Sequence, residues 1–91
     1  MNVGIIGLGH GSRVLIDAFK LSKMNIHGIS SKSINKAKEV QKNKNINKVY
    51  RNWIDLVKDN KIELVAIAVP PKLQPEIINK CIKYKKKIFA E

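Results

Sequence analysis

Short apolar runs alternate along the chain with longer segments in which apolar residues recur every three or four positions. The runs are rich in β-branched residues and are bounded by glycine, proline or asparagine, as expected of strands buried on both faces of a sheet. They cover residues 3–8, 25–30, 48–50, 62–69 and 87–90. The segments between them have the period of amphipathic helices. The pattern predicts the order βαβαβαβαβ.

The predicted helices carry recognisable start signals. The first covers about residues 11–23, and Ser33 is a suitable N-cap for a second that extends to about Lys42. Asn52 is placed to open the third helix, and Pro75 suits the first turn of the fourth. The apolar positions that these helices are expected to bury are Val14, Leu15, Ala18, Phe19, Ala37, Val40, Ile54, Leu56, Val57, Ile77, Ile78, Cys81 and Ile82.

Strands joined by helices require right-handed crossovers and form a parallel sheet that is covered on both faces. We therefore expect an α/β fold with a doubly wound, Rossmann-like parallel sheet in three layers and the strand order 3-2-1-4-5. The 91 residues are enough for a single small domain over residues 1–91. The chain ends after the fifth strand, whose edge we expect to be open and available for self-association.

A glycine-rich turn joins the first predicted strand to the first predicted helix. Gly7 allows a tight bend, Gly9 lets a ligand approach the backbone, and Gly11 begins a helix whose free N–H groups favour an anion. Ser12 is small enough for the helix to pack closely on the strand. The turn therefore predicts a site for the pyrophosphate of a dinucleotide, formed by Gly7, Leu8, Gly9, His10, Gly11 and Ser12. His10 could contact the pyrophosphate or be an exposed loop histidine.

The end of the second strand indicates which dinucleotide is preferred. NAD-binding domains usually carry an Asp or Glu there for the ribose 2′-hydroxyl. This chain has Ser30, Ser31, Lys32 and Ser33 instead. Hydroxyls and a cation favour a 2′-phosphate, so we expect NADP as the cofactor, with NAD as the alternative. In the other interpretation Ser33 is only an N-cap and Lys32 is only solvated.

Charge and composition limit the other classes of function. The formal charge of +11 comes from 16 lysines and two arginines, with 5% aromatic residues. Nucleic-acid sites rely on arginine and interleaved aromatics, so solvated helix faces are the favoured interpretation and we expect no nucleic-acid partner. A single cysteine, Cys81, and the lack of a leader or a membrane-spanning run predict a cytoplasmic protein. His10, His27 and Cys81 form no metal-site pattern, and Trp53 could be a packing anchor or a contact with another domain.

Residues 3–9, 66–71 and 86–91 together resemble the glucose–fructose oxidoreductase / inositol dehydrogenase (Gfo/Idh/MocA) family. The resemblance covers the whole chain and concerns the family's N-terminal NAD(P)-binding domain. Pro70 matches a proline that ends a strand in this family, Gln74 stands in the place of a histidine, and Glu91 matches the glutamate of a Glu-Lys-Pro motif. The resemblance implies that Val69, Pro70, Gln74 and Glu91 line the nicotinamide side of the site.

The resemblance also implies an NAD(P)-dependent oxidoreductase that transfers hydride to or from a sugar, cyclitol or related carbonyl. The family's catalytic lysine follows the glutamate at the position of Glu91, and its substrate domain follows later, so we expect the chain to bind cofactor without catalysing. The alternative is a stand-alone nucleotide-binding or sensing module. A Lys-Pro continuation after Glu91 in the coding region favours the enzyme, whereas a stop codon favours the module.

Overall fold

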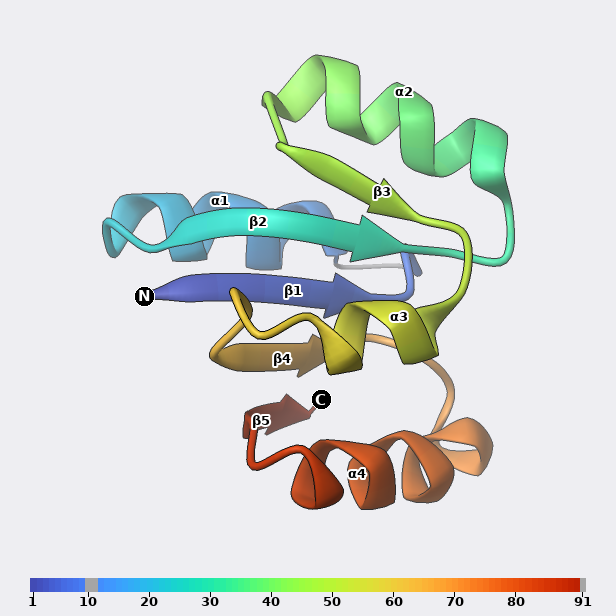
Figure 1. Ribbon diagram of the computed structural model, residues 1–91. Coiled ribbons are helices and arrows are strands. Elements are labelled where there is room, and N and C mark those ends of the chain that lie inside the picture. Colours follow the sequence, from blue (N-terminus) through green and yellow to red (C-terminus); the bar gives the residue numbers. More distant parts are fainter. Residues whose placement is uncertain (10–11, 91) are drawn as a thin grey trace.

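The computed structural model describes residues 1–9 and 12–90. Five parallel strands form one sheet in the order β3-β2-β1-β4-β5 (Figure 1), which confirms the predicted topology. The strands are β1 (Asn2–Ile6), β2 (Asn25–Ser30), β3 (Lys48–Tyr50), β4 (Leu64–Ile67) and β5 (Lys87–Ala90). The helices of the described ranges are α1 (Ser12–Leu21), α2 (Ile34–Lys44), α3 (Trp53–Lys58) and α4 (Gln74–Lys83), with the 3-10 turn η1 (Pro71–Leu73) before α4.

The helices cover both faces of the sheet and create two apolar cores (Figure 1). One core joins Val3 and Ile5 of β1 to Ile16 of α1 and Ala37 of α2. The other joins Ile6, from the opposite face of β1, to apolar residues of α3 and α4. The three predicted layers are therefore present. Within the described part of the chain, no helix is both long enough and apolar enough to cross a membrane.

β1 lies at the point where the chain reverses its direction of travel across the sheet. Its neighbours are β2 on one side and β4 on the other, and β3 and β5 lie outside them. In open α/β sheets a crevice forms beyond the carboxyl ends of the strands at such a point, and ligands bind there. The fold therefore places the ends of β1, β2 and β4 around one potential binding site.

The pairing of β1 with β2 contains a bulge at His27. Val3 pairs with Ile26, but the next residue, Gly4, pairs with Gly28. The extra residue shifts the two-residue alternation, so Ile26 and Ile29 both reach the core beside α1 and α2. His27 instead approaches Asp59, at the end of α3. The sequence predicted a strand over residues 25–30 but did not predict this bulge.

Three positions expected on buried helix faces are exposed. Val14 is 71% exposed and Ile82 is 63% exposed, and Ala18 also faces solvent. The buried stripe of α1 runs through Ile16, and Val14 lies about 200° away from it around the helix axis. α1 and α4 therefore bury narrower stripes than the sequence pattern suggested, whereas α2 buries Ala37 and Val40 as predicted.

Several predicted elements are also shorter in the structure. Residues 62–69 were expected to form one strand, yet β4 covers only Leu64–Ile67, because its pairing with β1 ends where β1 ends, at Ile6. Ile62 is buried although it precedes the strand. Gly7 and Leu8 follow β1 rather than extend it, because the chain bends at Gly7, whose φ is +94°. α1 ends at Leu21, two residues before the predicted boundary.

β5 is an edge strand, paired within the described chain only with β4. Phe89 is 44% exposed, and its ring meets that of Phe19 edge-on with the centroids 5.8 Å apart. Ile88 is half-buried against the core beside α4. The apolar side chains of this edge are thus partly covered by the domain itself, and self-association through it stays a prediction.

Candidate functional site: a cleft at the carboxyl ends of the strands

An open cleft lies beyond the carboxyl ends of the strands. Its volume is about 630 Å³, which falls within the range of about 300–1,000 Å³ usual for small-molecule sites. The chain contributes to it after each of β1, β2, β3 and β4 and from the first turns of α2, α3 and α4. The lining residues are Ile6, Gly7, Leu8, Gly9, Ser30, Ser31, Lys32, Ser33, Lys36, Arg51, Asn52, Trp53, Ala68, Val69, Pro70, Leu73, Glu76 and Ile77.

Gly7 forms the bend at the end of β1. Its φ of +94° is a conformation that favours glycine. A Cβ at this position would lie 2.5 Å from the carbonyl oxygen of Ala68. The Gly7 N–H donates to the carbonyl of Ser30 at 2.8 Å, and the Ala68 N–H donates to the carbonyl of Ile6 at 2.8 Å. The bend is therefore tied to the ends of both neighbouring strands.

Gly9 continues the turn toward α1, which begins at Ser12. A Cβ at Gly9 would lie 3.3 Å from the Ala68 carbonyl oxygen, a tight contact that still leaves the backbone bordering the cleft. A dinucleotide requires such a side-chain-free backbone where its phosphates approach a helix N-terminus. The described residues of the turn therefore fit the pyrophosphate of a dinucleotide.

Cationic and hydroxyl side chains line the cleft where β2 and β3 end. Ser31 and Lys32 belong to this group, as predicted from sequence. Ser33 caps α2, because its Oγ accepts the N–H of Lys36 at 3.2 Å, and it also lines the cleft. Lys36 and Arg51 line the same region and were not singled out from the sequence. Lys36 lies one helical turn after the cap and Arg51 directly follows β3, so the strand order could have indicated both.

Apolar side chains line the cleft after β4 and at the start of α3. Val69, Pro70 and Leu73 come from the segment after β4, and Trp53 contributes from the start of α3. Trp53 is half-buried and also packs against the core between α3 and α4, so its indole joins the core to the cleft wall. Gln74 does not line the cleft, and its Nε2 donates to the Val69 carbonyl at 3.0 Å.

Most of the predicted site residues meet in this one cleft. Those that line it are Gly7, Leu8, Gly9, Ser30, Ser31, Lys32, Val69 and Pro70. Ser12 is the first residue of α1. His10, Gly11 and Glu91 lie outside the described residues. The structure thus places these residues together, and their contacts with a cofactor stay predictions.

Among the described residues, the pKa values that shift belong to groups outside the cleft lining. Burial raises the pKa of Tyr50 well above its usual value, and the hydrogen bond from Tyr50 lowers the pKa of Asp59. Burial raises the pKa of the Cys81 thiol to about 11, consistent with the predicted core position. No group of three or more His, Cys, Asp or Glu suited to a metal ion occurs in the described ranges.

A glycine turn at the leading βα junction, a cleft at the switch point of a parallel sheet and a helix N-terminus together define a dinucleotide-binding α/β domain. The family comparison agrees. Residues 1–91 match the Gfo/Idh/MocA oxidoreductase family over its NAD-binding Rossmann fold. The chain belongs to this family and is an NAD(P)-binding domain.

Two curated relatives align with nearly the whole chain. Glucose-fructose oxidoreductase domain-containing protein 2 from Xenopus tropicalis is 27% identical over 89 residues, covering 98% of this chain and 23% of its own length. Myo-inositol 2-dehydrogenase from Thermotoga maritima is 24% identical over 92 residues, covering 100% of this chain and 28% of its own length. The chain thus spans about a quarter of the length of the curated relatives it matches.

Solved structures share the fold closely. Levoglucosan dehydrogenase in complex with NADH superposes with a TM-score of 0.92 at 22% identity, over 99% of this chain and 27% of that one. Biliverdin reductase from Synechocystis, in complex with biliverdin and NADP+, superposes with a TM-score of 0.89 at 20% identity, over 98% of this chain and 28% of that one. At these identities the likeness concerns the fold alone. The two proteins carry different nicotinamide dinucleotides on it.

Proposed function

We propose that the chain is the cofactor-binding domain of an oxidoreductase that prefers NADP to NAD. The observation that carries the preference is the group of Lys32, Lys36 and Arg51, which lines the cleft where β2 and β3 end. A 2′-phosphate adds negative charge to the adenosine ribose, and charged donors bind it strongly. The only carboxylate in the described lining, Glu76, belongs to α4 and not to this group.

The remaining contacts follow from the position of the glycine turn. The backbone from Gly7 to Ser12 would hold the pyrophosphate, and Ser31 would add a hydroxyl beside the cations. Val69 and Pro70, at the end of β4, would lie beside the nicotinamide, with Gln74 and Glu91 assigned to the same side. Because Gln74 donates to the Val69 carbonyl, it would act there by holding this segment in place.

The reaction proposed for the whole protein is hydride transfer between NADP(H) and a sugar, cyclitol or related carbonyl compound. Support comes from family membership and from the alignment with a myo-inositol 2-dehydrogenase. Hydride transfer needs a substrate held about 3–3.5 Å from the nicotinamide and a group that exchanges a proton with it. We expect residues beyond those of this chain to supply that pocket, so the chain should bind cofactor without turning it over.

The cofactor preference is tested by calorimetric titration of the protein with NADPH and with NADH in the same buffer. We expect NADPH to bind about 10–100-fold more tightly, the range given by one or two charge-assisted hydrogen bonds. Lys32→Asp should reverse the preference, because a carboxylate repels the 2′-phosphate and can accept a bond from the 2′-hydroxyl. Tighter binding of NADH by the unmodified protein would contradict the proposal. If Lys32→Asp binds NADPH and NADH with unchanged affinity, Lys32 does not take part in the proposed 2′-phosphate site.

A further inference from the structure

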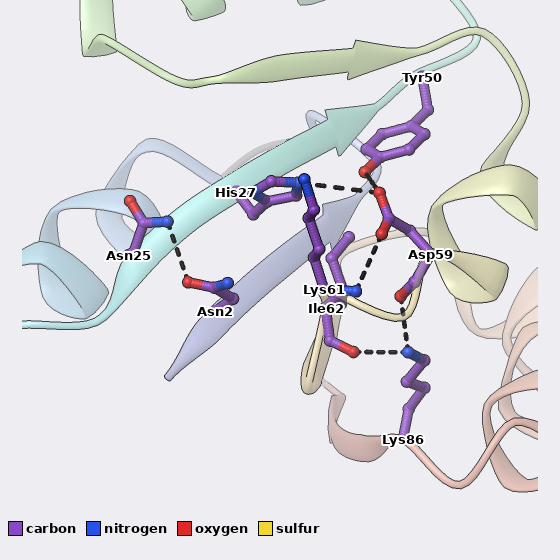
Figure 2. Close-up of polar contacts among 8 residues, drawn as sticks. All are labelled: Asn2, Asn25, His27, Tyr50, Asp59, Lys61, Ile62 and Lys86. Carbon is purple, nitrogen blue, oxygen red and sulfur yellow. Dashed lines mark hydrogen bonds and ion pairs between the residues drawn. The ribbon is translucent and has the colours of Figure 1, made fainter.

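A hydrogen bond links the residues on the two sides of α3. Tyr50 is the last residue of β3, and Asp59 is the C-cap of α3. The Tyr50 hydroxyl donates to Oδ2 of Asp59 (Figure 2). We call this hydrogen bond the clasp. α3 has six residues, and a helix of that length is not stable without external support. The clasp therefore joins the segments before and after α3, a helix that needs contacts with the rest of the domain to be stable.

The Asp59 end of the clasp is anchored by other contacts. Its Oδ1 accepts the N–H of Lys61 at 2.9 Å. Its backbone carbonyl accepts Lys86 Nζ at 2.8 Å and the N–H of Ile62 at 3.1 Å. Lys86 Nζ also donates to the Ile62 carbonyl at 2.5 Å, so it ties the segment after α3 to the turn before β5 (Figure 2). The carboxylate is thus a fixed point toward which the Tyr50 hydroxyl is directed.

The Tyr50 end is fitted closely to β2. Its side chain is buried, and its ring lies against Gly28, where a Cβ would be 2.2 Å from Tyr50 Cε1. The bulge in β2 directs His27 at the same carboxylate, with Nε2 3.8 Å from Asp59 Oδ2 (Figure 2). Among the described residues, β3 pairs only with β2, through three residue pairs. Tyr50 is therefore a principal attachment of this short edge strand to the domain.

The residues that follow Tyr50 form part of the cleft wall. Arg51, Asn52 and Trp53 all line the cleft. Asn52 caps α3, because its Oδ1 accepts the N–H of Ile54 at 2.9 Å. Two residues, Arg51 and Asn52, separate Tyr50 from Trp53 in the sequence, so a shift of the Tyr50 ring is expected to move this wall. The clasp, a part-buried hydrogen bond, is thus linked through the chain to the placement of Arg51 and Trp53.

We propose that the clasp holds Arg51 and Trp53 in the positions needed to bind the phosphorylated adenosine end of the cofactor. This inference rests on the function proposed for the cleft. Tyr50 and Asp59 do not line the cleft, so they act as positioning residues. Without the clasp the binding-competent arrangement is a smaller fraction of the population, and the apparent affinity falls by that fraction.

The test uses Tyr50→Phe, which removes the hydroxyl and keeps the ring. The probe is adenosine 2′,5′-bisphosphate, and its affinity should fall about three- to tenfold, the change expected from one hydrogen bond. Trp53 is the only tryptophan of the chain, so its fluorescence reports on the wall directly. Without ligand, at a temperature where the variant is folded, acrylamide should quench Trp53 more readily than in the unmodified protein.

Cys81→Ala is the matched control, since Cys81 is buried in the same core but takes no part in the clasp. It should lower the melting temperature and leave both readouts at the values of the unmodified protein. In a double-mutant cycle, Tyr50→Phe/Asp59→Asn should bind no more weakly than the weaker single variant, because both changes break one interaction.

Three results would contradict the proposed role of the clasp. The first is unchanged bisphosphate affinity and unchanged Trp53 quenching in Tyr50→Phe, and the second is an equal loss of affinity in Cys81→Ala. The third is a double variant in which the affinity losses of the two single variants multiply. If the unmodified protein fails to bind the bisphosphate, the proposed function is contradicted instead. The quenching of Trp53 then decides whether the clasp orders the wall.

Discussion

Replacing Gly7 with alanine should lower the free energy of unfolding by about 2–6 kcal/mol. The new Cβ would lie 2.5 Å from the Ala68 carbonyl oxygen and 2.7 Å from Val69 Cγ1, at a φ of +94°. The conformation and the overlap each cost about 1–3 kcal/mol. The bend must then move away from the ends of β2 and β4, so NADPH affinity should fall at least about tenfold. Urea unfolding and calorimetric titration measure the two effects.

Gly9→Ala is the informative control, because it separates binding from folding. Its Cβ would lie 3.3 Å from the Ala68 carbonyl oxygen, a contact that a shift of a few tenths of an ångström relieves. We expect a change in stability below about 1 kcal/mol. The methyl group would nevertheless hinder the approach of the phosphates, so NADPH affinity should fall about 10–100-fold. Unchanged affinity in Gly9→Ala would contradict a pyrophosphate site at this turn.

The triple variant Lys32→Ala/Lys36→Ala/Arg51→Ala should distinguish the two cofactors most strongly. We expect NADPH affinity to fall about 100-fold, and NADH affinity to change less than about threefold, because only NADPH carries the 2′-phosphate. The loss for NADPH should shrink as salt concentration rises, since these side chains border solvent. Parallel titrations at two salt concentrations measure both effects.

The matched control removes the same charge from sites outside the cleft. Lys38, Lys42 and Lys83 are exposed and do not line it. Their triple alanine variant should change NADPH affinity less than about threefold, because it alters only the long-range field of the protein. Equal losses for NADPH and NADH in the cleft variant, or an equal loss in the control, would contradict a 2′-phosphate site at these cations.

The topology could be predicted from sequence because the chain repeats one local signal. Each apolar run is followed by a helical period, and parallel strands joined by helices allow few arrangements. The glycine turn could be located for a similar reason, since Gly7 and Gly9 occupy the one junction where a tight bend opens a βα unit. Both features depend on residues that are close in sequence.

The features that could not be predicted depend on contacts between distant segments. The bulge at His27 exists only in the pairing of β1 with β2, which the sequence of β2 alone does not determine. The exposure of Ile82 likewise reflects how α4 lies on the sheet, which its own periodicity does not determine. Trp53 had two open interpretations, and the structure places it both in a core and in the cleft wall.

The most direct measurement is a titration of the isotopically labelled protein with NADPH and with NADH, followed by backbone amide resonances. We expect the largest shifts for NADPH at Gly7, Leu8 and Gly9, where we propose that the pyrophosphate binds, and at Ser31 and Lys32, where we propose that the 2′-phosphate binds. NADH should shift the first group and affect the second less. If both groups stay unchanged in a folded sample saturated with either coenzyme, the cleft does not bind the dinucleotide and the account is wrong.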